Sequence, residues 1–133
     1  MADNGAGVGS DSDAPKKIMV VDDEEGVRSL LRLLFARDPQ FTVIAEAEDG
    51  VEALTLAMQH HPDYVILDYS MPRMNGEEAA RVLRGMQSHL CIVAFSSIVT
   101  DRPEWADAHL SKEDFNDLLP LLQKLEANNC SIA

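Results

Sequence analysis

Short apolar runs that end at polar residues recur along the chain and alternate with segments of helical periodicity. Such runs suit parallel strands that are buried on both faces. A regular alternation of strand and helix predicts right-handed crossover connections and a parallel sheet covered by helices on both sides. The class we expect is therefore α/β, a doubly wound sheet of five strands at residues 17–21, 41–47, 63–67, 90–95 and 108–110.

The segments between these runs carry apolar residues at the i, i+3, i+4, i+7 spacing of a helix with one buried face. We expect helices at residues 24–37 and 51–60, a third after Gly76, and a last one that begins at Asn116 or Asp117 and runs to Ala127, because Pro120 is tolerated only in a first turn. The side chains expected to be buried on the first three helices are Val27, Leu30, Leu31, Leu34, Val51, Leu54, Ala57, Met58, Ala79, Val82, Leu83 and Met86.

The length of 133 residues suits one domain and is too short for two. We expect a disordered N-terminal tail at residues 1–15, a domain at 16–127 and a C-terminal tail at 128–133. The first 15 residues have neither the basic start nor the apolar segment of a signal peptide.

The charge of the chain excludes several classes of partner. With 23 acidic and 11 basic residues the net charge is -12, which repels nucleic acids and anionic lipid. No stretch approaches the roughly 20 apolar residues that cross a bilayer. The two cysteines, Cys91 in an apolar run and Cys130 near the C-terminus, do not suggest a disulfide framework. We therefore expect a cytoplasmic protein with no direct nucleic-acid or membrane partner.

Polar residues collect where the predicted strands end. Asp22 and Asp23 follow the first strand, Asp68 the third, Ser96 the fourth and Lys112 the fifth. Ligand sites of parallel sheets lie beyond the carboxyl ends of the strands, so these side chains are expected to converge. Three neighbouring carboxylates repel one another, and a divalent cation that prefers oxygen ligands, usually Mg²⁺, relieves that repulsion. Lys112 adds a positive charge that is expected to pair with Asp68 when the site is empty.

This set of residues suits phosphoryl transfer, which needs an in-line nucleophile and cations around the equatorial oxygens. Asp68 is the candidate nucleophile, and the metal and Lys112 are the cations. Ser96 is the candidate donor of a hydrogen bond to the same group. Ser97 is an alternative donor, and either serine also suits a turn cap.

Three stretches of the chain resemble the receiver domain of the response-regulator family, also called CheY-like. They are residues 18–24 (IMVVDDE), 47–54 (AEDGVEAL) and 63–76 (DYVILDYSMPRMNG), within a resemblance that spans about residues 16–125. It implies a flavodoxin-like fold. By position it implies that Asp68 is the phosphoacceptor, that Lys112 is the family lysine and that Ser96 is the hydroxyl residue that moves toward the phosphoryl group. The metal ligands that it implies for Mg²⁺ are Asp22, Asp23, Asp68 and the backbone carbonyl of Ser70.

The resemblance also implies a place in two-component signalling. A sensor histidine kinase or a histidine phosphotransfer protein donates the phosphoryl group, and the receiver catalyses its own phosphorylation and later hydrolysis. It is therefore expected to be a switch rather than an enzyme that turns over other substrates. Output is expected through a downstream protein that the sequence does not identify.

The last third of the chain departs from the family pattern. Glu113 stands where most members have proline, and His109 stands where they have tyrosine or phenylalanine. His109 is either a surface histidine beside a strand end or a pH-sensitive switch side chain. The segment between Ser96 and Lys112 is short and contains Pro103, which predicts a stunted fourth helix. Since the family relays its signal through this region, we expect altered output more than altered chemistry.

Two other functions fit part of the pattern. A haloacid-dehalogenase-like phosphatase also uses an aspartate after a parallel strand, but its second aspartate, two positions on, is Ser70 here. A receiver-like interaction module that works without phosphorylation is suggested by Glu113, His109 and the short fourth helix.

Overall fold

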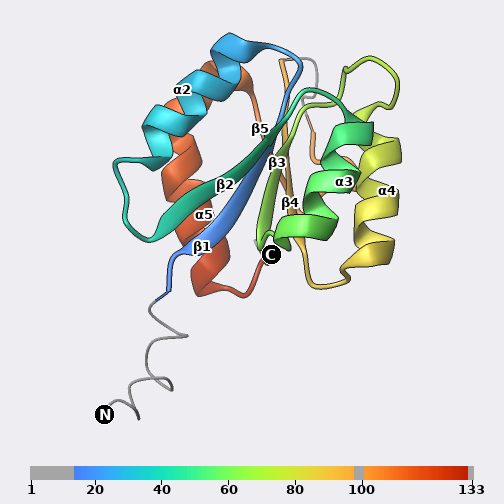
Figure 1. Ribbon diagram of the computed structural model, residues 1–133. Coiled ribbons are helices and arrows are strands. Elements are labelled where there is room, and N and C mark those ends of the chain that lie inside the picture. Colours follow the sequence, from blue (N-terminus) through green and yellow to red (C-terminus); the bar gives the residue numbers. More distant parts are fainter. Residues whose placement is uncertain (1–13, 98–100, 132–133) are drawn as a thin grey trace.

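A five-stranded parallel sheet with helices on both faces forms the centre of the molecule (Figure 1). The computed structural model describes residues 14–97 and 101–131. In the order β2-β1-β3-β4-β5, the strands are β1 (Lys16–Val21), β2 (Phe41–Ala47), β3 (Tyr64–Leu67), β4 (Cys91–Phe95) and β5 (Ala108–Leu110). The predicted α/β class and doubly wound sheet are confirmed. The chain reverses its direction of winding between β1 and β3, which is where such sheets form a crevice.

Helices of the described residues cover both faces of the sheet (Figure 1). The first layer consists of α2 (Glu25–Phe35) and α5 (Leu118–Ala127), and the second of α3 (Gly50–His60) and α4 (Gly76–Met86). A short 3₁₀ helix, η1 (Lys112–Asp117), leads into α5. Each layer closes its own hydrophobic cluster against the sheet, whose β3 and β4 residues are all buried. Among the described helices, none combines the length and hydrophobicity that a bilayer-spanning segment requires.

Alanines rather than large side chains bring α3 and α4 against the sheet. The buried residues of these helices include Ala53, Ala57, Ala79 and Ala80. The prediction of buried positions was wrong for four large side chains here and for one on α2. These side chains are exposed by 37–62%: Leu30, Val51, Met58, Val82 and Met86. Small residues allow a closer approach of helix to sheet, and the larger neighbours are then displaced to the rim of each contact.

The C-terminal third follows the sequence expectation in outline. Helix α5 begins at Leu118 after Asp117, so Pro120 lies in its first turn as predicted. Between β4 and β5, the described residues 96–97 and 101–107 contain turns and no helix. The expectation of a stunted helix between Ser96 and Lys112 agrees with this part of the connection.

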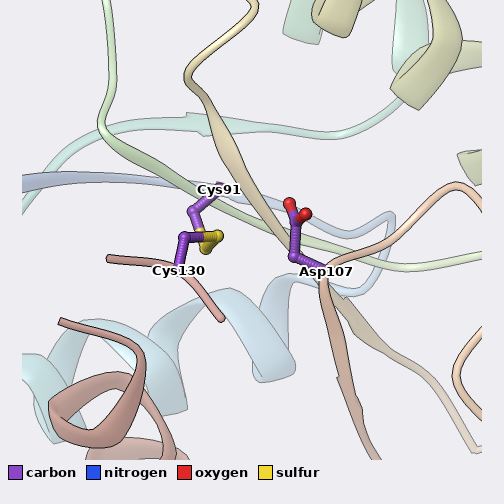
Figure 2. Close-up of side chains that lie close together, drawn as sticks. All are labelled: Cys91, Asp107 and Cys130. Atoms are coloured by element: carbon purple, nitrogen blue, oxygen red, sulfur yellow. A yellow bond between two sulfur atoms is a disulfide. The ribbon is translucent and has the colours of Figure 1, made fainter. Parts of the chain in front are cut away.

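The two cysteines form a disulfide, which the sequence analysis did not predict. Cys91 begins β4 and Cys130 lies just beyond α5, with 5.9 Å between their Cα atoms (Figure 2). The expectation failed because the two residues are 39 positions apart and meet only through the packing of α5 on the sheet.

Gly76 fixes how closely α4 approaches the end of β3. A Cβ atom on Gly76 would lie 2.5 Å from the carbonyl oxygen of Asp68 and 2.9 Å from the Cα of Tyr69. Its N–H also donates to the Tyr69 carbonyl oxygen at 2.8 Å. The backbone at Asp68 is therefore packed directly against the first residue of a helix, which limits its freedom to shift.

We predict that Gly76→Ala lowers the free energy of unfolding by about 1–3 kcal/mol, because its methyl group must displace backbone rather than a mobile side chain. Gly85→Ala is a matched control in the same helix, where nothing lies within 4 Å of the added Cβ. That change should raise stability by about 0.5–1 kcal/mol. Urea unfolding of both variants checks the pair, and equal effects would contradict the close packing at Asp68.

Candidate functional site

Three carboxylates gather beyond the carboxyl ends of β1 and β3. Asp22, Asp23 and Asp68 each offer an oxygen atom within 4.8 Å of the other two. Asp22 and Asp68 are buried, whereas Asp23 is exposed. The backbone N–H of Asp22 donates to Ala47 at 3.0 Å, and that of Asp68 donates to Val21 at 3.0 Å. Hydrogen bonds to neighbouring strands thus hold both buried carboxylates in place.

Lys112 reaches this cluster from the start of η1. Its Nζ lies 2.8 Å from Oδ2 of Asp22, 3.3 Å from Oε1 of Glu24 and 3.4 Å from Oδ2 of Asp68. The lysine side chain is itself only 17% exposed. Lys112 was expected to pair with Asp68, and it does so, but Asp22 is its nearer partner. One cation therefore bridges the two buried carboxylates.

Burial dominates the ionisation of the two buried carboxylates. It raises the pKa of Asp22 above its ordinary value, although Lys112 and the Glu24 N–H lower it in part. Burial, and then the charge of Asp22, raises the pKa of Asp68 against the opposing effect of Lys112. Burial by itself lowers the pKa of Lys112, but the neighbouring carboxylates of Asp22 and Asp68 outweigh burial, so the pKa of Lys112 is raised. The site thus favours keeping a cation beside its carboxylates.

The donor set fits a small hard cation. Three carboxylates face one lysine within the cluster, so negative charge is in excess. Oδ2 of Asp22 is buried and, in the described structure, receives no hydrogen bond of normal geometry, although Lys112 lies 2.8 Å away. An oxygen atom in that position suits coordination of a cation such as Mg²⁺, which binds carboxylates together with water.

The structure places the two serines of the predicted site differently. Ser96 is buried directly after β4, and its N–H donates to the Leu110 carbonyl oxygen at 3.3 Å. Ser70 is exposed in the loop between β3 and α4. Their roles toward a phosphoryl group and a metal stay predictions.

Two charged neighbours of the cluster escaped the sequence analysis. Glu24 pairs with Lys112, and Nη1 of Arg28 donates to the carbonyl oxygen of Asp22 at 2.6 Å. Arg28 lies 3.7 Å from Glu46 on β2 as well. The position of Arg28, one turn into the helix that follows Asp22 and Asp23, is the feature of the sequence that indicates its nearness to the cluster.

The loop after Asp68 is tied to two other segments. Arg73 forms an ion pair with Asp49, the buried N-cap residue of α3. Tyr69 stacks on Trp105 with 6.1 Å between ring centroids and 18° between planes. The lone tryptophan, which lies in the connection between β4 and β5, therefore packs against the loop after Asp68 and also lines a cavity of about 510 Å³ beside α4.

The departures at His109 and Glu113 lie on either side of Lys112 in the sequence. Nδ1 of His109 is buried and has no hydrogen-bond partner in the part of the chain that the structure describes. The N–H of Glu113 donates to the Ser111 hydroxyl at 3.3 Å, so Ser111 caps the start of η1. The backbone at Lys112, the first residue of η1, is therefore held by this cap.

Comparisons with known proteins agree on one family. Residues 18–119 match the family described as "Response regulator receiver domain". A protein-glutamate methylesterase/protein-glutamine glutaminase of Pyrococcus horikoshii is 38% identical over 106 residues, which cover 78% of this chain and 28% of that protein. The chain thus spans under a third of that relative's length.

Two solved structures show the same likeness. A LuxR-family two-component response regulator from Aurantimonas sp. SI85-9A1 superposes with a TM-score of 0.73 at 32% identity, covering 86% of this chain and 85% of that one. A chain in the complex of histidine kinase ThkA with response regulator protein TrrA gives 0.73 at 31% identity, covering 83% and 97%.

The bridging role of Lys112 predicts a pH-dependent loss in Lys112→Met. The carboxyl groups of Asp22 and Asp68 have higher pKa values in the folded protein than in the unfolded chain. Their contribution to stability is therefore complete below the unfolded pKa, about pH 4, and is lost as the pH rises through the folded pKa. Without the lysine, two buried carboxylates are uncompensated at pH 7.5, and we expect a loss of about 3 kcal/mol that shrinks toward pH 4. Denaturant unfolding at both pH values measures it.

Lys124→Met is the matched control, because Lys124 is exposed on α5. It should change stability by less than about 0.5 kcal/mol at either pH. A Lys112→Met loss that is equal at pH 4 and pH 7.5 would show that Lys112 acts through packing instead of charge.

Proposed function

Since the chain belongs to the response regulator receiver domain family, we propose that it is a phosphorylation switch that accepts a phosphoryl group on Asp68. The observation that carries this proposal is the buried pair Asp22 and Asp68 with Lys112 between them. Both the position of Asp68 after β3 and the match of residues 18–119 support it.

Asp68 is the proposed nucleophile. Its carboxylate attacks the phosphorus atom of the donor in line with the leaving group, and a new P–O bond forms as the bond to that group breaks. Lys112, now 3.4 Å from Asp68, is close enough to pair with an oxygen of the transferred group. The Ser96 hydroxyl is the proposed hydrogen-bond donor to a second oxygen.

Mg²⁺ is the proposed cofactor. Asp22, Asp23, Asp68 and the Ser70 carbonyl are the residues that would hold it, with water completing the shell. When bound, the ion supplies positive charge to the oxygens of the phosphoryl group. Asp22 would be a ligand of the ion, and Lys112, which pairs with Asp22 at 2.8 Å in the described structure, would then be available to an oxygen of the phosphoryl group.

The proposed partners follow from the family. Receiver domains interact with histidine kinases, so we propose a sensor histidine kinase or a histidine phosphotransfer protein as the donor. A downstream protein receives the signal, and the chemistry of the chain is confined to its own phosphorylation and hydrolysis. We propose further that the receiver unit spans residues 16–127 and that it is cytoplasmic, as is typical of the family.

Incubation with acetyl phosphate and Mg²⁺ tests the phosphoacceptor directly. Intact-protein mass spectrometry should detect the addition of one phosphoryl group to the wild-type chain, and chelation of Mg²⁺ with EDTA should reduce it at least tenfold. Asp68→Asn should show none. Asp114→Asn, a change at an exposed aspartate in η1, is the matched control and should label like the wild type.

An adduct that persists in Asp68→Asn would assign the chemistry to another residue. The absence of any adduct in the folded wild-type chain would favour the alternative, an interaction module that signals without phosphorylation. Sustained release of phosphate from simple esters would instead indicate a phosphatase.

A further inference from the structure

We propose that Cys91 and Cys130 form a reversible thiol–disulfide site, which a dithiol reductant opens and which sets how firmly the end of α5 is held on the sheet. The proposal concerns the end of the sheet opposite the acidic cluster. It is therefore independent of phosphorylation at Asp68.

The disulfide joins two segments that only the tertiary structure brings together. Cys91 is the buried first residue of β4 and lies beside Tyr64 of β3 in the sheet register. Cys130 is half-buried and follows α5 (Figure 2). The bond closes a loop of 39 positions that contains β4, β5, η1 and α5. It is therefore a covalent tether between the last helix and the centre of the sheet.

The backbone at Cys130 has a conformation that cysteine does not favour. Its φ of 65° lies in the left-handed region, which costs energy for most residues other than glycine, whereas Asn129, with a φ of 53°, is of a type that tolerates this region. The Cys130 N–H donates to the Leu125 carbonyl oxygen at 2.7 Å within this turn. Such geometry persists where its surroundings impose it, and the disulfide is one such restraint. Opening the bond leaves the turn free to relax.

A metal site is the competing use of these sulfur atoms, because Asp107 offers an oxygen atom within 4.8 Å of both (Figure 2). That carboxylate is already engaged. Its Oδ2 accepts from the Ile92 N–H at 2.9 Å and from Nη2 of Arg84 at 3.0 Å. Asp107 thus serves to fasten the start of β4 to α4, and the two sulfur atoms are bonded to each other. Redox exchange fits these contacts better than coordination.

A reductant has access to the bond. Both cysteines line a surface cavity of about 300 Å³, together with Lys16 and His89. Cys130 is the more exposed of the two residues, so we place the first attack on its sulfur. A thiolate of the dithiol bonds to the Cys130 sulfur while the disulfide bond breaks, and Cys91 leaves as a thiolate that takes up a proton. The second thiol of the reductant then displaces Cys130, so that two electrons reach the chain and the reductant becomes a disulfide.

The test compares oxidised and reduced wild-type protein. Under denaturing conditions, alkylation followed by mass spectrometry should add no label to the oxidised chain and two labels to the reduced chain, and re-oxidation should restore the first state. Reduction should lower the melting temperature by about 10 °C, because a loop of this length is no longer closed in the unfolded state. Amide hydrogen exchange in α5 should accelerate several-fold, whereas exchange in α3, on the other face, should change little.

Cys130→Ser is the matched variant. It should melt with the reduced wild type and should not respond to reductant. If this variant does not fold, the reversible changes in melting temperature and hydrogen exchange of the wild-type chain still test the proposal without any substitution.

Several outcomes would overturn the proposal. One is that both thiols remain free after oxidation, and another is that they pair between chains. Stoichiometric binding of Zn²⁺ that blocks disulfide formation would identify a metal site instead. An exchange rate in α5 that is the same in both redox states would show that the bond does not control the helix.

Discussion

Two buried carboxylates that share one lysine are the constraint on which the rest of the site depends. Asp22 and Asp68 directly follow the neighbouring strands β1 and β3, and their charges would be uncompensated if Lys112 were absent. The lysine comes from the far side of the sheet, after β5, so the ion pairs also join the edge of the fold to its centre. Under the proposed function, a metal or a phosphoryl group that enters the cluster would change these pairs. Binding and rearrangement would then be linked.

The parallel sheet explains why the site was visible in the sequence. Residues that follow the strands of a parallel sheet lie at one edge of it, so the sequence predicts that Asp22, Asp68 and Lys112 lie together. The choice of partner was not visible, because whether Lys112 lies nearer Asp22 or Asp68 depends on side-chain geometry of less than an ångström. The same holds for Arg28, whose contact is with a backbone carbonyl.

Features that depend on how closely the elements pack are not visible in the sequence. Met58 and Val82 match the helical period and are nevertheless exposed, because alanines of α3 and α4 make the contacts with the sheet. The Cys91–Cys130 bond joins positions whose proximity follows from the length and direction of α5. Periodicity predicts which elements form, and the sizes of the interface residues then decide which side chains are covered.

In the proposed switch, Lys112 would exchange Asp22 for the phosphoryl group when a metal is held by Asp22. A crystal structure with Mg²⁺ and beryllium trifluoride, which mimics an aspartyl phosphate, tests this exchange. We expect beryllium on the Asp68 carboxylate, the metal against Asp22 and Asp23, and Nζ of Lys112 moved onto a fluorine atom. Beryllium bound elsewhere, or Lys112 still paired with Asp22 beside an occupied Asp68, would contradict the exchange.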